Sequence, residues 1–485
     1  MRRPCWLVLA PLMGNAACAP PAPPRPALGT PIDTMALRRH GAYLASDLLE
    51  GRGTGTRGAA VAAAYLGAQC RALGLEPLGP RYLMDVPLEE ARIRLDEAVV
   101  RIARGGDTTE LRAGDDFLAV GGTRAALGRF TGRLVYVGTD DEIRAAATLP
   151  PLTDAVAVTG GAIRTDVATR LREGGAVGVV QLTGSAEGYA LYRASRGLAM
   201  ILHADPGITS SFHPPLPALV LAPHAAPALV AAVRDGGMLD ARLTFDQRPI
   251  HAWNVGCVLP GRDARLRDSL IALTAHYDHL GFSVPDEHGD SLYNGFSDNA
   301  AGVAMLLAIA QAVRATPDGA LRHSLVVLFF TGEERGLLGS DYFVTRPPVP
   351  LERFRAVINL DAGAPPARPW SWRVAGGSGT ALGALAADVA AERGWSATLS
   401  PPSANSDYFP FLDRGVPAVF LIPGSAPYEG LSADSSQALR RRWDRYHQAG
   451  DEYHEAFPFE GLRRYATYAL LLVEAVDRGR LRREP

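Results

Sequence analysis

Five short segments of this 485-residue chain carry side chains that could do chemistry together. In chain order they are AHYDHLG, NGFSDNAAG, FTGEERGLLGS, NLDAG and RYHQAGDEY. The residues that they supply are His276, Asp278, His279, Asp298, Glu333, Glu334, Asp361 and His447. Carboxylates gathered at one place repel one another unless cations neutralise them. The segments therefore predict a cation site, provided that the fold brings them together.

The types of side chain indicate which cation the site would bind. Imidazole and carboxylate without thiolate suit Zn²⁺, with Mn²⁺ or Co²⁺ as substitutes. A single catalytic zinc uses three protein ligands and keeps one position open, which is fewer ligands than these segments offer. The surplus predicts two metal ions about 3.5–4 Å apart that share one carboxylate.

Two adjacent glutamates, Glu333 and Glu334, follow the apolar run from Leu325 to Phe330. Neighbouring side chains on a strand or a helix point in different directions, so the two carboxylates can serve different purposes. One can bind metal while the other points into the cleft. A carboxylate held beside a metal-activated water can take the proton of that water as a general base.

The second half of the chain alternates between strand and helix patterns. We expect strands at 269–275, 324–331, 356–360 and 418–422, and helices at 300–314, 379–393 and 461–478. Fully apolar strands flanked by helices predict an α/β fold with a mainly parallel central sheet that is covered on both faces. In such sheets, ligands lie beyond the carboxyl ends of the strands, which is where the acidic and His residues fall.

Changes in composition and in the pattern of apolar residues divide the chain into five parts. They are a leader at 1–19, a Pro-rich linker at 20–33, the first part of the main domain at 34–122, an insert at 123–247 and the main domain proper at 248–485. The insert consists of short apolar runs separated by Gly, Pro and helix-like segments, which predicts a small α/β or β-rich unit. It lacks a dense polar cluster, so we expect it to shield or to bind rather than to catalyse.

The N-terminus resembles an export leader. Arg2 and Arg3 form a short basic region, an apolar stretch follows from Trp6 to Met13, and small residues surround Cys18. Cys18 fits a lipoprotein attachment point, whereas Ala17-Cys18-Ala19 fits simple signal-peptide cleavage. The protein is thus expected to be exported, as a periplasmic or outer-membrane-anchored lipoprotein or as a secreted protein.

Composition excludes several classes of function. The net charge of −2 gives no support for a nucleic-acid surface or a polybasic membrane patch, so a membrane contact would depend on a lipid at Cys18. The sequence contains no lysine, which excludes Schiff-base and P-loop lysines. Beyond the leader only Cys70 and Cys257 remain, either as a disulfide or as two separate buried thiols.

The five segments resemble, in sequence and in order, the motifs of the M28 family of co-catalytic zinc peptidases, which includes bacterial secreted aminopeptidases. The segment LASDLLEGRGTGTRG near the N-terminus is similar to that family as well, and the resemblance covers about residues 36–120 and 250–480. The insert is similar in position and texture to the protease-associated domain that many such peptidases carry.

The resemblance implies a function for each residue of the site. His276 and Asp361 would hold one zinc, Glu334 and His447 the other, and Asp298 would bridge the two ions. Glu333 would be the general base and later protonate the leaving amine. Asp278 would accept the spare imidazole N–H of His276 and so orient that ring. The bond between Asp298 and Asn299 is often cis in the family. His279 is expected to be structural or to form part of the rim.

Departures from the family pattern concern the substrate cleft. Relatives often have His after a Ser-Asp pair, whereas here Tyr408 follows Ser406 and Asp407. Asp407 and Tyr408 are therefore candidates for the cleft, with a packed tyrosine as the alternative. After His447, Ala449 replaces the proline of many relatives, which is expected to loosen that loop.

The resemblance implies an aminopeptidase that acts on peptide or protein N-termini with two Zn²⁺ ions per chain. Three alternatives remain: a carboxypeptidase or dipeptidase of the same family, a cyclising acyltransferase that works with one zinc, and a non-catalytic receptor-like scaffold. A carboxypeptidase would need a cation for the terminal carboxylate of its substrate, for which Arg335, Arg373 and Arg414 are the nearby candidates.

Overall fold

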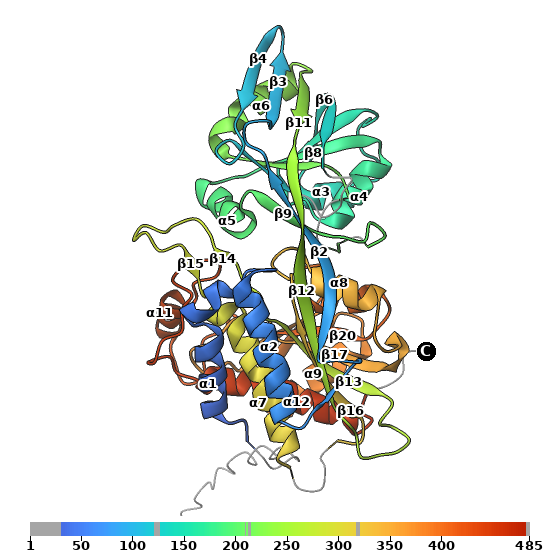
Figure 1. The fold of residues 1–485 in the computed structure, drawn as a ribbon, viewed down its shortest axis with the longest axis vertical. Coiled ribbons are helices and arrows are strands. Elements are labelled where there is room, and N and C mark those ends of the chain that lie inside the picture. Colours follow the sequence, from blue (N-terminus) through green and yellow to red (C-terminus); the bar gives the residue numbers. More distant parts are fainter. Residues whose placement is uncertain (1–30, 121–126, 209, 212–214, 317–320, 482–485) are drawn as a thin grey trace, which may run out of the picture.

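The computed structural model describes residues 31–120, 127–208, 210–211, 215–316 and 321–481. The predicted leader, Cys18 and most of the Pro-rich linker lie outside these residues. The described chain forms two units, which are built on two large sheets (Figure 1). The long strands β2 and β12 pair with each other and run from one unit to the other (Figure 1).

The lower unit in Figure 1 contains a ten-stranded sheet in the order β19-β18-β20-β17-β13-β16-β12-β2-β9, and β1 pairs with β12. Its four middle strands are parallel, as the fully apolar sequences predict. They are β20 (Ala418–Pro423), β17 (Phe354–Asn359), β13 (Leu270–His276) and β16 (Ser324–Phe330). The strands toward both edges include antiparallel pairs. They are β1 (Glu76–Pro77), β2 (Leu83–Ile93), β9 (Ala199–His203), β12 (Phe245–Leu259), β18 (Ser371–Ala375) and β19 (Ser396–Ser400).

Helices cover both faces of this sheet, which confirms the predicted α/β class. One face packs against α1 (Thr34–Leu44), α2 (Arg57–Ala72), α7 (Ala301–Arg314), α9 (Ala381–Ala391) and α12 (Glu460–Asp477). The other face packs against α8 (Leu338–Thr345) and α10 (Tyr408–Asp413). The segment Phe296–Arg314, which includes α7, is long and apolar enough to cross a membrane, but 89% of its apolar stretch is buried inside the protein. It is therefore a core helix.

The upper unit contains an eight-stranded sheet in the order β4-β3-β11-β6-β7-β8-β10-β5. Its strands are β3 (Val99–Arg104), β4 (Asp107–Leu111), β5 (Phe117–Val120), β6 (Arg129–Gly138), β7 (Ala155–Thr159), β8 (Ala176–Leu182), β10 (Ala218–Leu221) and β11 (Met238–Arg242). Its helices are α3 (Asp140–Ala145), α4 (Thr165–Glu173), α5 (Ala186–Arg196) and α6 (Ala226–Arg234). The boundary expected at 122/123 is therefore wrong, because β3, β4 and β5 precede it and pair with strands of this sheet. The likeness of this unit to a protease-associated domain stays a prediction.

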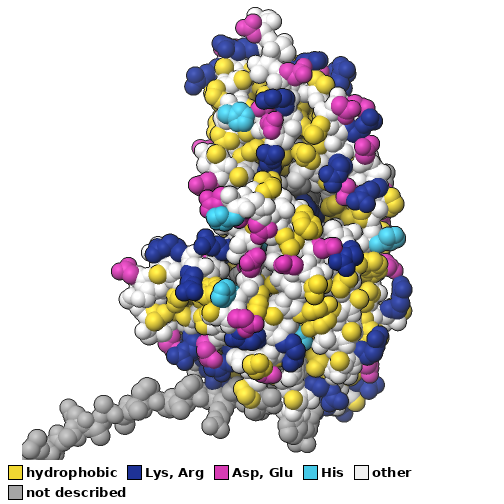
Figure 2. Space-filling model, turned by 60° about the vertical axis from the view of Figure 1, so that its left-hand side comes forward, with side chains coloured by type: hydrophobic (Ala, Val, Ile, Leu, Met, Phe, Trp, Pro, Cys, Tyr) yellow, Lys and Arg dark blue, Asp and Glu magenta, His cyan; other side chains and the backbone are white. Residues whose placement is uncertain are grey.

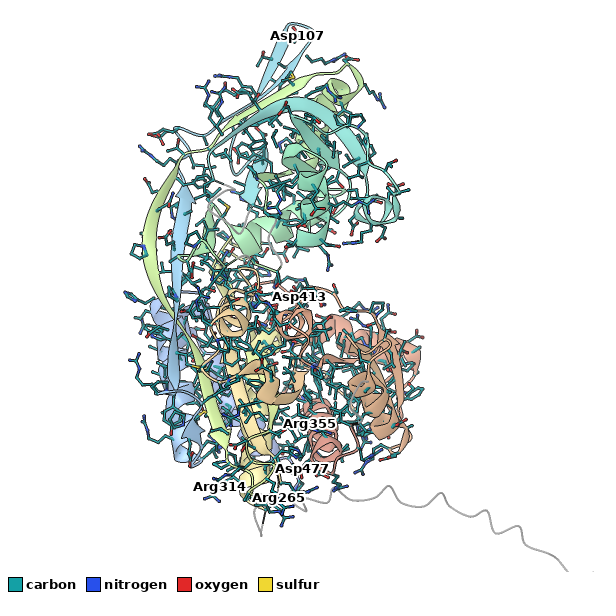
Figure 3. All side chains as sticks on the ribbon, turned by 90° about the vertical axis from the view of Figure 1, so that its right-hand side faces the viewer. Asp107, Arg265, Arg314, Arg355, Asp413 and Asp477 are labelled. Atoms are coloured by element: carbon teal, nitrogen blue, oxygen red, sulfur yellow. A yellow bond between two sulfur atoms is a disulfide. The ribbon has the colours of Figure 1, made fainter. Side chains whose placement is uncertain are left out.

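A cleft of about 1190 Å³ separates the two units on one side. Side chains of α3 and α4 line it from above, and residues near α10, among them Asp413, line it from below (Figure 3). Elsewhere on the surface, Arg side chains alternate with Asp and Glu without forming a patch of one sign on the face that Figure 2 shows.

Short elements complete the lower unit. They are the turns η1 (Asp47–Arg52), η4 (Phe296–Ala300) and η5 (Leu351–Arg353), the two-stranded sheet of β14 (Gly281–Phe282) and β15 (Leu292–Tyr293), and the helix α11 (Ala433–Trp443). In the upper unit, the turn η3 (Pro223–Ala225) precedes α6. Several of these short elements hold the loops that follow the central strands.

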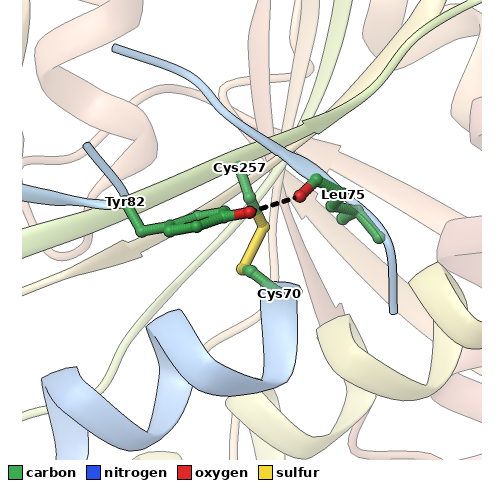
Figure 4. Close-up of a disulfide and its surroundings, with 4 residues drawn as sticks. All are labelled: Cys70, Leu75, Tyr82 and Cys257. Carbon is green, nitrogen blue, oxygen red and sulfur yellow. Dashed lines mark hydrogen bonds between the residues drawn. A yellow bond between two sulfur atoms is a disulfide. The ribbon is translucent and has the colours of Figure 1, made fainter. Parts of the chain in front are cut away.

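Cys70 and Cys257 form a disulfide, which resolves the two alternatives left open by the sequence (Figure 4). The bond joins the last turn of α2 to β12, across 187 positions of the chain, and both sulfurs are buried. Beside it, the Tyr82 hydroxyl donates a hydrogen bond of 2.7 Å to the carbonyl of Leu75 (Figure 4). The disulfide thus fastens the N-terminal helices to the central sheet.

Removing this disulfide is expected to lower the free energy of unfolding by about 2–4 kcal/mol, because the bond restricts the unfolded chain. Urea unfolding of a Cys70→Ser/Cys257→Ser double variant, compared with the parent protein, measures the difference. A reducing agent should lower the midpoint of the parent and leave that of the double variant unchanged. Equal midpoints for the parent with and without reductant would contradict the pairing.

Candidate metal centre

The predicted ligands lie where the middle strands of the large sheet end. His276 is the last residue of β13, Glu334 follows β16, and Asp361 follows β17. Asp298 stands in the turn before α7, and His447 in the loop after α11. Because β13, β16 and β17 are parallel neighbours, their carboxyl ends meet at one edge and bring these side chains together.

One group of ligands gathers around His276. Its Nε2 atom lies 2.7 Å from Oδ1 of Asp361 and 3.1 Å from Oδ1 of Asp298. The ring is buried, and its Nδ1 atom is 3.1 Å from the backbone carbonyl of Asp278. The nitrogen that faces the carboxylates is therefore the one available to a metal ion.

A second group gathers around His447. Its Nε2 atom lies 2.9 Å from Oε2 of Glu334 and 3.1 Å from Oδ2 of Asp298. Asp298 thus directs one carboxylate oxygen to each imidazole. Two imidazoles and three carboxylates, arranged as two groups that share Asp298, are the donor types and the number that two zinc ions require. The residues present fit such a centre.

The electrostatics of the cluster favour positive charge at its centre. Burial acts to lower the pKa of His447, but Glu334 and Asp298 outweigh it and raise that pKa to about 10. Burial acts to raise the pKa of Asp298, yet the hydrogen bonds from His276 and His447 hold it well below the ordinary value. Neighbouring carboxylates thus stabilise cations between them, as divalent metal ions would.

Backbone contacts hold Asp298 in place. The peptide bond from Asp298 to Asn299 is cis, as the resemblance implied. The buried carboxylate of Asp451 accepts hydrogen bonds from the backbone N–H groups of Ser297 and Asp298, at 2.9 and 3.0 Å. Asn299 donates from its side chain to the carbonyl of Leu360, just before Asp361. The loop that carries the shared ligand is therefore tied to two of the other ligand loops.

The structure corrects the role predicted for Asp278. Its carboxylate lies 3.8 Å from Nδ1 of His276, and its backbone carbonyl is the closer partner. The carboxylate instead accepts hydrogen bonds from the Thr54 hydroxyl, at 2.7 Å, and from the backbone N–H of Glu333, at 3.3 Å. Adjacent residues on an extended segment point apart, which separates the side chain from the ring that its own backbone contacts. Asp278 thus positions the turn that carries Glu333.

Glu333 is half-buried beside this cluster. Burial raises the pKa of its carboxyl well above the ordinary value, and the charges of Asp361, Glu334 and Asp407 add to this effect. The positive charge of His276 opposes it. A raised pKa suits a carboxylate that takes up a proton during a reaction.

The two residues predicted for the cleft are both buried. Tyr408 packs against Phe420, and its hydroxyl bonds with both backbone groups of Ser403, so the packed alternative is the one observed. Asp407 accepts a hydrogen bond of 2.5 Å from Ser340, and burial raises its pKa to about 8. Both side chains are buried in the structure, and a contact of either one with the substrate stays a prediction.

Ser406, which precedes this pair, contacts a ligand. Its hydroxyl donates to Oδ2 of Asp361, the oxygen that faces away from His276. Asn359 donates to Ser406, at 2.6 Å, and Thr274 donates to Asn359, at 2.7 Å. This buried chain of hydrogen bonds fixes the orientation of the Asp361 carboxylate.

His279 lies closer to the centre than its sequence position suggested. Its Nδ1 atom is 2.6 Å from Oε1 of Glu334, and the side chain is fully buried. Together with Asp298 and Glu334 it forms a group that could hold a metal ion. The buried Nε2 atom of His279 has no hydrogen-bond partner among the described residues. The spacing of three between His276 and His279 was the only sequence signal for this contact.

Replacing Asp451 by Asn should weaken the centre. An amide offers one acceptor oxygen where the carboxylate offers two, so one backbone N–H near Asp298 is left unsatisfied, at a cost of about 1–3 kcal/mol. Denaturant unfolding and metal content by elemental analysis measure the two consequences, lower stability and weaker metal retention. Asp444→Asn, at an exposed position of the same loop, is the matched control. Full metal retention in Asp451→Asn would contradict the role described for this carboxylate.

Comparisons with known proteins agree with this geometry. The sequence model of peptidase family M28 matches residues 254–473. A probable leucine aminopeptidase 2 from Aspergillus oryzae is 28% identical over 223 residues, which are 40% of this chain. That alignment spans 43% of the fungal protein, so the chain matches less than half the length of this curated relative.

Solved structures are similar across both units. An aminopeptidase from Aneurinibacillus sp. strain AM-1 has a TM-score of 0.58 at 20% identity, covering 94% of this chain and 96% of its own. A zinc aminopeptidase from Bacillus subtilis has a TM-score of 0.53 at 17% identity, covering 92% and 96%. A peptidase M28 precursor from Shewanella amazonensis has a TM-score of 0.52 at 18% identity, covering 93% and 97%. These likenesses establish the fold, and the family match includes all five ligand segments. Residues 254–473 of this chain, which carry the five ligand segments, thus match peptidase family M28 in sequence.

Proposed function

We propose that this protein is a zinc-dependent aminopeptidase that hydrolyses the first peptide bond of peptides or proteins. The observation that carries the proposal is the convergence of two imidazoles on the shared carboxylate of Asp298, with Glu334 and Asp361 completing the two groups. The M28 domain and the aminopeptidases among its relatives support the same class of reaction.

In this proposal the centre holds two zinc ions. When bound, they would lower the pKa of a water molecule and polarise the carbonyl of the scissile bond. Glu333 takes the proton of the attacking water and later gives it to the leaving amine. Asp278 positions the backbone of this general base, because its carboxylate accepts a hydrogen bond from the backbone N–H of Glu333. Ser406 orients the carboxylate of Asp361 by donating a hydrogen bond to it, and Asp451 holds the backbone of Asp298 by accepting its N–H.

The surroundings of the centre favour an aminopeptidase over a carboxypeptidase. The Arg335 guanidinium donates to the carbonyl of Ser195 at 2.6 Å, and that of Arg414 donates to the backbone of Val344. Arg373 is exposed on β18. Backbone carbonyls thus bind two of the three candidate cations, whereas several carboxylates of the centre would attract a free α-amino group. The complete set of ligands weighs against the scaffold and the one-zinc acyltransferase.

We further propose that the protein works outside the reducing cytosol. The disulfide between Cys70 and Cys257 is of the kind that persists in oxidising compartments. The leader predicted at 1–19 supports export, and attachment of a lipid at Cys18 stays a prediction.

Metal removal and a small substrate panel test the proposed class of enzyme. Chelation should abolish hydrolysis of aminoacyl-anilides, and added Zn²⁺ should restore it, with two zinc ions per chain by elemental analysis. N-blocked anilides and carboxypeptidase substrates with a blocked N-terminus should not be cleaved. Cleavage of the blocked substrates, or turnover that survives complete metal removal, would refute the proposal.

A Glu333→Gln variant tests the general base. Because the amide cannot take the proton, kcat should fall by about 10²–10⁴-fold, the usual contribution of such a group, while KM changes little. Zinc content should remain at the parent level, since Glu334 and not Glu333 contacts His447. A variant that keeps full kcat, or one that loses a zinc ion, would assign Glu333 another role.

A further inference from the structure

Arg52 belongs to the N-terminal motif LASDLLEGRGTGTRG, for which the proposed reaction provides no role. Its side chain has a relative exposure of 0%, and it is the only arginine among the described residues that is classed as buried. Ion pairs stabilise most buried guanidinium groups. No carboxylate of the described residues lies within 4.0 Å of this one, so another set of contacts must hold it.

The guanidinium donates only to backbone carbonyls. Nε donates to Tyr277 at 2.7 Å, one Nη atom donates to Asn294 at 2.7 Å and to Leu44, and the other donates to Gly295 at 2.9 Å. Five N–H donors in a rigid plane allow four such contacts at once. Arg52 therefore binds three separate segments of backbone.

Two of these segments carry metal ligands. Tyr277 follows His276 directly, and Asn294 and Gly295 lie three and four residues before Asp298. The backbone of Arg52 adds a further contact, because its carbonyl accepts the N–H of His279 at 3.2 Å. The guanidinium thus sets the distance between the loop of His276 and the loop of the shared ligand.

The loop around Arg52 is built for close approach. Gly51 has a φ of 61°, and a Cβ there would lie 2.3 Å from the carbonyl of Tyr293, so a larger residue would push the loop away. Thr54, two residues after Arg52, donates to the carboxylate of Asp278 at 2.7 Å. The N-terminal loop therefore contacts both ligand segments. Thr54 and Arg52 bond to the segment that follows His276, and Arg52 also bonds to the segment that precedes Asp298.

The charge of Arg52 is retained at neutral pH. Burial lowers its pKa to about 10, and the more distant carboxylates of Asp278, Asp451, Asp298 and Glu334 act in the opposite direction. The positive charge of Arg52 repels cations bound at the centre. Its hydrogen bonds, in contrast, hold the loops that carry the ligands of those cations in place. The two effects of Arg52 on metal affinity have opposite signs, which makes them separable.

We propose that Arg52 is a positioning residue of the metal centre, whose hydrogen bonds to the two ligand loops set the affinity for zinc. This inference rests on the proposed zinc site. It assigns to the N-terminal segment, more than 200 residues away in sequence from the ligands, a direct part in metal binding.

Two variants separate positioning from charge. Arg52→Lys keeps the charge but loses the planar fork of donors, and Arg52→Gln loses both. Positioning predicts that both variants bind zinc about 10- to 100-fold more weakly, as is usual when a group that supports a ligand is removed. A purely electrostatic role predicts unchanged affinity in Arg52→Lys and tighter binding in Arg52→Gln.

Zinc affinity is measured by competition with a chromophoric chelator, well below the unfolding temperature of each variant. The visible spectrum of the Co²⁺-substituted protein reports the coordination geometry and should change in Arg52→Lys. Arg57→Lys is the matched control, since Arg57 lies in the same segment and pairs with Glu50 at the surface. It should leave both readouts unchanged.

Parent affinity and an unchanged Co²⁺ spectrum in Arg52→Lys would overturn the inference. If the Arg52 variants do not fold even with zinc, Gly51→Ala decides, because a Cβ there pushes away the loop that carries the Arg52 guanidinium. Several-fold weaker zinc binding there supports the inference, and unchanged binding refutes it. Failure of the parent protein itself to bind zinc would instead refute the proposed function.

Discussion

Mutual repulsion of carboxylates at one edge of the central sheet is the constraint on which the rest of this structure depends. The side chains of Asp298, Glu334 and Asp361 lie within hydrogen-bonding distance of three imidazoles, those of His276, His279 and His447. Such a group is tolerable when positive charge lies among it, and metal ions supply that charge most compactly. The buried carboxylates of Asp278, Asp407 and Asp451 add to the same demand.

The protein supports this arrangement mainly through its backbone. Parallel strands β13, β16 and β17 end at a common edge of the sheet. Residues from distant segments of the chain form buried hydrogen bonds with the loops of the metal centre. Asp451 binds the loop of Asp298, Ser406 orients Asp361, and Thr54 holds Asp278. Because each partner comes from a different part of the chain, the geometry of the centre depends on the fold of the whole lower unit.

The sequence was informative about the centre and less so about its supports. Residue types and their order predicted the five residues that the structure brings together, and four of them follow a recognisable strand or precede a helix. The role of Asp278 was mispredicted, because a spacing of two residues does not reveal whether a carboxylate or a carbonyl faces a ring. The boundary near residue 122 failed for a related reason: short strands such as β3 carry no signal of which sheet they join.

By itself, the sequence determined the α/β class, the chemistry of the donor atoms and the exclusion of thiolate and lysine sites, since these follow from local pattern and composition. Only the tertiary structure decided which oxygen of Asp298 faces which imidazole, that Cys70 pairs with Cys257, that Tyr408 is packed and that Arg52 bonds to the backbone of two ligand loops. Those facts concern contacts between residues that are distant in the chain. Such contacts arise from close packing of the folded core, which no local pattern encodes.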